Sequence, residues 1–184
     1  MDKIQEAVHR LKRGDIGGLE TLVSHFQGKA VRVAFLITQD ELAAEDIVQD
    51  TFIRIYQHIH HFDETQPFEP YLMKSVVYAA LNSIRHVLRS TSLDGDSAEV
   101  ETLLNKHDLT ETQVEANQLS QEILAALVKL SPRQRAVIVL RYYLEMSEQE
   151  MTQTLRVAPG TIKWLLNAAR TRLRDLLHRD RSIK

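Results

Sequence analysis

Apolar residues recur every three or four positions through most of the chain, the spacing that places them on one face of an α-helix. The first three stripes run over Ile4–Leu11, Ile16–Ile37 and Ala44–Ile59, and a fourth runs over Leu72–Val87. Two prolines within residues 60–70 predict a loop between the third and fourth stripes. No segment alternates polar and apolar residues as a half-buried strand does, so the pattern predicts an all-α fold.

Short polar motifs mark the expected starts of several helices. Asp40 is a favoured N-cap residue just before the third stripe. Ser131 followed by Pro132 combines an N-cap residue with a proline in the first helical turn. Ser147 precedes Glu150 by three residues, which is the spacing of a capping box. These motifs divide the second half of the chain into several short helices.

A polar, acidic stretch at 93–112 interrupts the helical pattern. We expect it to be a flexible linker between two small helical domains, 1–92 and 113–184. Thr110 has capping-box spacing to Gln113 and predicts the first helix of the second domain. The apolar residues of the next two helices are Leu119, Ile123, Leu127, Leu130, Ala136, Val137, Leu140 and Tyr143.

The second domain ends in two helical patterns joined by a very short turn around Val157. Met151 and Leu155 form the inner face of the first, and Pro159 opens the second. The inner face of the second helix holds Ile162, Leu166, Ala169 and Leu173. This is the helix-turn-helix arrangement, in which the second helix enters the major groove of DNA. The residues expected to reach DNA from it are Thr161, Lys163, Trp164, Asn167 and Arg170. An ordinary helical hairpin would share the same pattern.

Charge is unevenly distributed along the chain. The net charge of −2 divides into −2 for residues 1–92, −6 for 93–115 and +6 for 116–184. A basic last third behind an acidic spacer indicates a polyanionic partner for that third alone. We expect the acidic stretch to serve as a soluble tether, as a shield for the basic domain, or as a polyanion mimic that runs through a nucleic-acid channel of a partner.

Other chemistry is excluded by what the sequence lacks. There is no cysteine, so disulfides and thiolate metal sites are excluded. His58, His60 and His61 do not share one helix face, so we expect no metal site. No phosphate-binding loop, dinucleotide turn or nucleophile–base motif is present, so we expect neither an enzyme nor a cofactor. No apolar run is long enough to span a membrane and no signal sequence precedes the domains, which fits a cytoplasmic protein.

Two blocks of sequence resemble one known family. The segment LSPRQRAVIVLRYYLEMSEQEMTQTLRVAPGTIKWLLNAARTRLRDLL is similar to the C-terminal domain of extracytoplasmic-function (ECF) sigma factors of bacterial RNA polymerase. AEDIVQDTFIRIY at 44–56 and FEPYLMKSVVYAALNSIR at 68–85 resemble that family's N-terminal domain. The resemblance implies a protein that binds core RNA polymerase and directs it to promoter DNA. An anti-sigma factor is a further partner expected from the family.

The resemblance also assigns roles to residues of the first domain. The helix over 41–59 would dock on the polymerase, and its expected contacts are Glu45, Asp46, Gln49, Asp50 and Arg54. Like charges four residues apart, such as those of Asp46 and Asp50, destabilise a free helix and would be relieved by a basic partner. The segment 62–89 would meet the −10 promoter element and help to open it. Its expected DNA contacts are Tyr71, Lys74, Tyr78, Asn82 and Arg85, with Phe52 and Phe68 assigned to the core.

The helix-turn-helix would read the −35 element, but it departs from the family pattern. Arg156 stands where the family commonly has glycine, and Ala158 where it has serine. Trp164, Leu165 and Ala168 replace small or basic residues. We expect Trp164 and Leu165 either to contact thymine methyl groups or to form an apolar patch that another protein covers. The alternatives to a sigma factor are a stand-alone helix-turn-helix regulator and an adaptor that no longer reads DNA.

Overall fold

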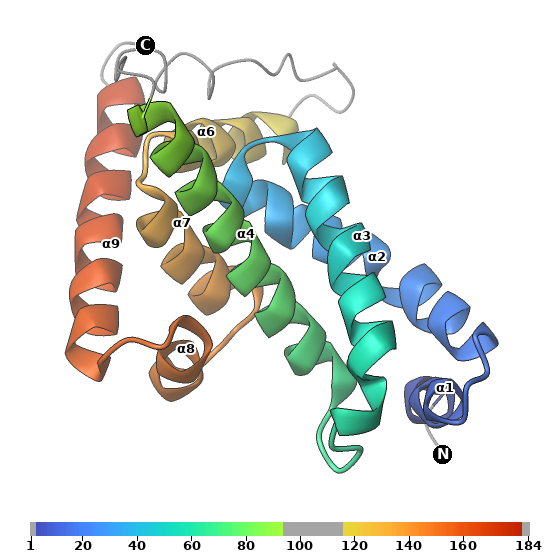
Figure 1. Ribbon diagram of the computed structural model, residues 1–184. Helices are drawn as coiled ribbons and strands as arrows, with labels where there is room; N and C mark the ends of the chain where they lie inside the picture. The colour runs from blue at the N-terminus through green and yellow to red at the C-terminus, as the bar shows by residue number, and fades with distance from the viewer. Residues whose placement is uncertain (1–2, 94–115, 182–184) are drawn as a thin grey trace. The chain divides into compact units, whose positions relative to one another are not determined.

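The computed structural model describes residues 3–93 and 116–181, and the fold of these residues is all-α, as the sequence predicts (Figure 1). Backbone contacts divide the chain into two compact units, Met1–Ser83 and Ile84–Lys184. The division falls inside the long helix α4. The predicted linker at 93–112 lies, apart from Leu93, outside the described residues, as does the predicted capping box at Thr110, so the predicted domain boundaries stay a prediction.

The first unit is built from packed helices whose apolar stripes meet in one core. Its elements are α1 (Lys3–Lys12), α2 (Gly17–Thr38), α3 (Glu41–His58), a 3₁₀ turn η1 (Ile59–His61) and α4 (Phe68–Leu93). α1 packs on α2 at Gly18, where a Cβ would clash with the carbonyl oxygen of Ala7. The core holds the predicted stripe of α3 and both Phe52 and Phe68. Ile16 opens the predicted second stripe but does not belong to the core, because it is 64% exposed.

A two-residue turn joins α2 to α3. Gln39 ends α2 in the left-handed conformation, at φ 62°. Asp40 is the N-cap of α3, and its side chain accepts a hydrogen bond from the backbone N–H of Ala43 at 3.0 Å. The predicted N-cap is confirmed. This short connection packs α2 and α3 side by side. Residues on the side of α3 away from its buried stripe, such as Leu42 and Gln49, are exposed.

The predicted loop over 60–70 is too long at its C-terminal end. α4 begins at Phe68, so Pro70 lies in its first turn. The first N–H groups of a helix have no intrahelical acceptor, and a proline there forfeits no hydrogen bond. The stripe of α4 is also shorter than predicted at its far end, because Val87 is exposed.

The second unit contains the short helices that the capping motifs predict. They are α6 (Ala116–Val128), α7 (Pro132–Ile138), a π-helical turn η2 (Val139–Tyr143), α8 (Glu148–Leu155) and α9 (Pro159–Arg181). The predicted capping box of Ser147 with Glu150 is present, and so is the predicted N-cap Ser131. Ser131 also forms a capping box with Gln134, which was not predicted. Two predicted core positions are wrong, since Ile123 and Tyr143 are exposed. The π-helical turn, which shifts the register of the residues that follow Ile138, accounts for Tyr143.

A buried arginine closes the C-terminal end of α6. Arg135 is 1% exposed, and its Nη1 donates to the carbonyl oxygens of Val128 at 3.2 Å and Leu130 at 3.1 Å. These are carbonyls that the end of a helix leaves without intrahelical donors. Burial lowers the pKa of the Arg135 guanidinium to about 10, which leaves it charged at neutral pH. Arg135 therefore ties α6 to α7 beneath the helix-turn-helix.

Candidate nucleic-acid interface

The helix-turn-helix is formed by α8, the turn 156–158 and α9. Arg156 adopts the left-handed conformation at φ 53° and ψ 46°, the conformation that favours glycine. The carbonyl oxygen of Ala158 accepts from the N–H groups of Thr161 and Ile162, so Ala158 occupies the position before α9. Its methyl group offers no acceptor to the first N–H groups of the helix. At both positions, the residue that the family usually has would thus make the folded domain more stable.

The inner face of α9 packs against the rest of its unit. Ile162, Leu166 and Ala169 are buried as predicted. Leu165 is buried too, at 5% exposure, so the prediction that it contacts DNA or forms a surface patch is wrong. Its place on the helix, next to the predicted face, widens the stripe that the core covers.

The predicted DNA-contacting residues lie on the opposite face of α9. Lys163, Trp164, Asn167 and Arg170 are exposed, and Thr161 is half-buried at the edge. Trp164 is 66% exposed, an unusual state for the largest apolar side chain. The structure therefore brings the predicted set to one surface with an aromatic centre and cations beside it.

One neighbour of this surface was not predicted. Arg170 donates from Nε to the hydroxyl oxygen of Tyr142 at 2.9 Å, and its Cζ lies 5.9 Å from the centroid of the tyrosine ring. Tyr142 belongs to the π-helical turn η2, 28 residues earlier in the chain. Sequence spacing carries no signal for such a contact, because it depends on how η2 packs near α9.

A second candidate surface runs along α4. Steps of three and four residues place Tyr71, Lys74, Tyr78, Asn82 and Arg85 on one side of the helix. Lys74, Tyr78 and Arg85 are exposed, and Tyr71 and Asn82 are half-buried. Arg85 lies beyond the division between the two units.

The N-terminal end of that surface rests on an aromatic cluster. The Tyr71 ring packs 4.8 Å from the ring of Phe62 and 6.2 Å from that of Phe68, measured between centroids. Phe62 and Phe68 are both buried. Tyr71 therefore presents only part of its ring to a ligand, whereas Tyr78 presents about half of its surface.

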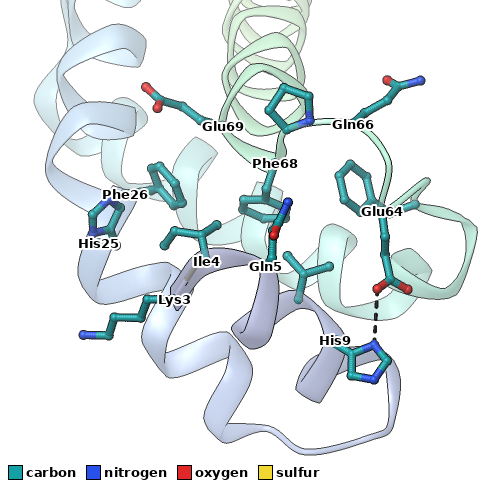
Figure 2. A pocket seen from close by; sticks show the side chains of 13 residues that line it. Lys3, Ile4, Gln5, His9, His25, Phe26, Glu64, Gln66, Phe68 and Glu69 are labelled. Atoms are coloured by element: carbon teal, nitrogen blue, oxygen red, sulfur yellow. Dashed lines mark hydrogen bonds and ion pairs between the residues drawn. The ribbon is translucent and has the colours of Figure 1, made fainter. Parts of the chain in front are cut away.

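The loop before α4 is fastened to α1, which the sequence did not suggest. Lys12 donates from Nζ to the carbonyl oxygen of Phe62 at 2.8 Å and forms an ion pair with Glu64 at 2.8 Å. His9 Nδ1 lies 3.3 Å from the other carboxylate oxygen of Glu64 (Figure 2). The hydrogen bonds from Lys12 and His9 lower the pKa of Glu64. A hollow of about 520 Å³ lies beside His9 and Glu64. Ile4, Phe26 and Phe68 are among the side chains that line it (Figure 2).

The predicted polymerase-docking residues lie on the outer face of α3. Glu45, Asp46, Gln49, Asp50 and Arg54 are all exposed, and none of them forms an ion pair within the described residues. Among the residues that the structure describes, the like charges on this face therefore have no ion-pair partner. This is the electrostatic arrangement that a basic partner would relieve.

The same face of α3 carries apolar side chains that the sequence analysis overlooked. Leu42 is 75% exposed, and Ile53 and Tyr56 are 45% and 41% exposed. Leu42, Gln49 and Tyr56 are spaced by seven residues, which places them along one line of the helix, as in a helix that packs against another helix. The 3.6-residue period could have revealed this second stripe opposite the core stripe.

Residues 3–93 and 116–181 contain no group of three or more His, Asp or Glu side chains close enough to hold a metal ion. His58, His60 and His61 are exposed. In the same ranges, no helix combines the length and the apolar character that crossing a bilayer requires.

Comparison with known proteins places both units in one family. The Sigma-70 region 2 model matches residues 22–89, and the Sigma-70 region 4 model matches residues 120–173. The chain is similar to the ECF RNA polymerase sigma factor SigW of Bacillus subtilis, with 29% identity over 180 residues that cover 95% of this chain and 96% of SigW. It is also similar to SigM of the same organism, another ECF RNA polymerase sigma factor, with 24% identity over 88% of this chain and 96% of SigM.

Solved structures share the fold. The sigma factor RpoE of Bartonella quintana, in complex with the anti-sigma factor NepR, matches with a TM-score of 0.70 and 24% identity over 86% of this chain and 96% of that one. CnrH, in complex with the cytosolic domain of CnrY, matches with a TM-score of 0.65 and 21% identity over 97% of this chain and 99% of that one.

Proposed function

The chain belongs to the ECF sigma factors of bacterial RNA polymerase, and from its exposed surfaces we propose which residues perform that function. It binds core RNA polymerase and directs promoter-specific initiation of transcription. It is a regulatory protein and catalyses no reaction itself. In this proposal α3 docks on the polymerase, α4 contacts the −10 element and α9 reads the −35 element.

The observation that carries the proposal is the outer face of α3. It combines unpaired carboxylates, such as those of Asp46 and Asp50, with the exposed apolar residues Leu42 and Ile53. An acidic face would attract a basic partner and raise the association rate, while burial of the apolar side chains would hold the complex together. A surface facing only water would gain nothing from those apolar groups.

The two DNA-contacting surfaces support the second half of the proposal. On α9, Lys163 and Arg170 suit phosphate contacts, and Asn167 can pair with an adenine edge in the major groove. Trp164 offers an apolar surface for thymine methyl groups. On α4, the exposed ring of Tyr78 can stack on an unpaired base while Lys74 contacts the strand.

Run-off transcription tests the proposal directly. The purified chain and core RNA polymerase are mixed with fragments of the source genome, and the transcripts are mapped. We expect discrete start sites that depend on the added chain. If core polymerase yields the same transcripts with and without the chain, the proposed function is wrong.

The exposed Trp164 motivates a competing function, an adaptor that binds another protein through α9. A stand-alone regulator is the third possibility. A regulator shifts duplex DNA in the absence of polymerase, an adaptor yields no promoter-specific transcript, and a sigma factor requires core enzyme. The same transcription assay, run beside a duplex-binding assay without polymerase, separates all three.

The proposal extends to partners and location. One structural neighbour is a sigma factor held by an anti-sigma factor, which supports a partner of that class for this chain. Since its work is done with RNA polymerase, we place the protein in the cytoplasm.

A further inference from the structure

The contact between Tyr142 and Arg170 is made at the surface of the second unit. Both side chains are exposed, and Tyr142 is 59% exposed. Arg170 donates from Nε to the Tyr142 hydroxyl at 2.9 Å, and its guanidinium lies near the ring, with Cζ 5.9 Å from the centroid. Burial of apolar surface therefore contributes little to the free energy of this contact.

The contact restricts the orientation of the guanidinium. A planar guanidinium has donors on two edges, and the Tyr142 hydroxyl takes the Nε donor. The terminal nitrogens form the fork that binds a phosphate or carboxylate with two parallel hydrogen bonds. An arginine held in this way has already lost part of the side-chain freedom that it would otherwise lose on binding.

The location of Arg170 suits a phosphate rather than a base. Lys163 and Arg170 are seven residues apart, so they lie two turns, or about 10 Å, apart along one flank of α9. Trp164 and Asn167 occupy the part of the helix that faces outward between them. In a helix that lies in the major groove, such flanking cations meet the sugar–phosphate backbone.

The π-helical turn supplies the tyrosine. In η2, the N–H of Leu144 bonds to the carbonyl oxygen of Val139 at 3.0 Å, and that of Met146 bonds to the carbonyl oxygen of Leu140 at 2.9 Å. These wide turns change the direction in which the side chains between them project. Short π-helical turns within helices are often found at functional sites.

We propose that Tyr142 is a positioning residue that holds the Arg170 guanidinium ready to bind a backbone phosphate beside the groove that α9 reads. The inference rests on the proposed promoter-binding function. It adds a residue outside the helix-turn-helix to the DNA-binding surface. Because a phosphate contact carries no sequence information, the pair raises affinity for promoter and non-promoter duplex alike.

The test compares Tyr142→Phe, Arg170→Ala and the double variant, each as the full chain bound to core RNA polymerase. The probe is a promoter fragment selected by run-off transcription with the wild-type chain, and affinity is measured between 50 and 200 mM salt. Tyr143→Phe is the matched control, because it removes the same hydroxyl from the neighbouring exposed tyrosine.

We expect Tyr142→Phe to weaken promoter binding about three- to tenfold, which is within the usual net contribution of one hydrogen bond at an exposed site. The salt dependence should not change, because the charge of Arg170 remains. Arg170→Ala should weaken binding further and reduce the salt slope by about 1. The double variant should bind like Arg170→Ala alone, and Tyr143→Phe like the wild type.

Two results would overturn the inference. Equal promoter affinity of Tyr142→Phe and wild type, even with a lowered unfolding midpoint, would show that the pair only fastens η2 to α9. Independent effects that multiply in the double variant would show that Tyr142 does not act through Arg170. By contrast, a wild-type chain that gives no promoter complex at all would refute the proposed function itself, before any variant is compared.

Discussion

Replacing Leu42 with serine should weaken binding to core RNA polymerase about tenfold while leaving the fold intact. Full burial of a leucine side chain stabilises a complex by about 1.5–3 kcal/mol. Leu42 is 75% exposed in the free chain, so its burial in an interface would yield about 1–2 kcal/mol. Because 1.4 kcal/mol corresponds to a factor of ten, the dissociation constant should rise by about that factor. The free energy of unfolding should hardly change, since the side chain contributes little to the core.

The assay is a titration of labelled chain with core RNA polymerase, followed by fluorescence anisotropy, beside urea unfolding of each free variant. Ile16→Ser is the matched control, because Ile16 is a similarly exposed apolar residue, at 64%, in the same unit but outside α3, at the N-cap of α2. We expect Ile16→Ser to bind like the wild type. Binding of Leu42→Ser within twofold of the wild type would refute the assignment of this face. An equal loss for Ile16→Ser would show that exposed apolar residues bind the polymerase without regard to position.

Three further changes separate stability from binding. Asp46→Asn should raise the free energy of unfolding, measured with urea, by about 0.2–0.5 kcal/mol, because it removes a like-charge pair with Asp50. The same change should lower the association rate with polymerase at low salt, measured by stopped flow. Ala158→Ser should add about 1 kcal/mol of stability by supplying the missing N-cap of α9, and an unchanged unfolding midpoint would contradict this account. Arg135→Ala should cost about 3–5 kcal/mol in urea unfolding, because it leaves a cavity and deprives two carbonyl oxygens of their donor. Arg135→Met removes the same charge and the same donor but fills the space of the arginine stem, so it should cost less; equal losses would show that packing of the stem is unimportant.

The sequence predicted best those features that depend on residues only a few positions apart, such as helix caps and buried helix faces. The N-caps at Asp40, Ser131 and Ser147 were found because a capping side chain and the backbone N–H that donates to it lie three residues apart. The buried face of α3 was found because its period is that of the helix. The same reasoning failed at Tyr143, where the backbone leaves the α-helical period for a π-helical turn. No residue pattern in the sequence predicted the π-helical turn.

The pattern of polar and apolar residues could not predict contacts between distant segments of the chain. Lys12 holds the carbonyl oxygen of Phe62, 50 residues away, and Tyr142 holds Arg170, 28 residues away. Each contact depends on how two helices pack, which a period does not specify. Leu165 was misjudged for a related reason, since the width of the buried stripe on α9 depends on the elements that cover it. The exposed set of Lys163, Trp164 and Asn167 was nevertheless correctly placed on the surface.

The departures at Arg156 and Ala158 are compatible with the proposed function because α9 need not bind DNA alone. A left-handed arginine and an uncapped helix start each cost about 1 kcal/mol of stability. Lys163 and Arg170 are the cations among the predicted DNA contacts of α9. By itself such a domain would bind duplex weakly, because affinity grows with the number of phosphates neutralised. If α3 docks on the polymerase as proposed, the second contact becomes effectively intramolecular, at local concentrations in the millimolar range. An α9 that binds DNA weakly is then sufficient, because docking holds it near the promoter. Trp164 and Asn167 can then serve the choice of bases rather than overall affinity. It follows that a substitution that disrupts docking should reduce promoter use more than one that removes a single contact of α9.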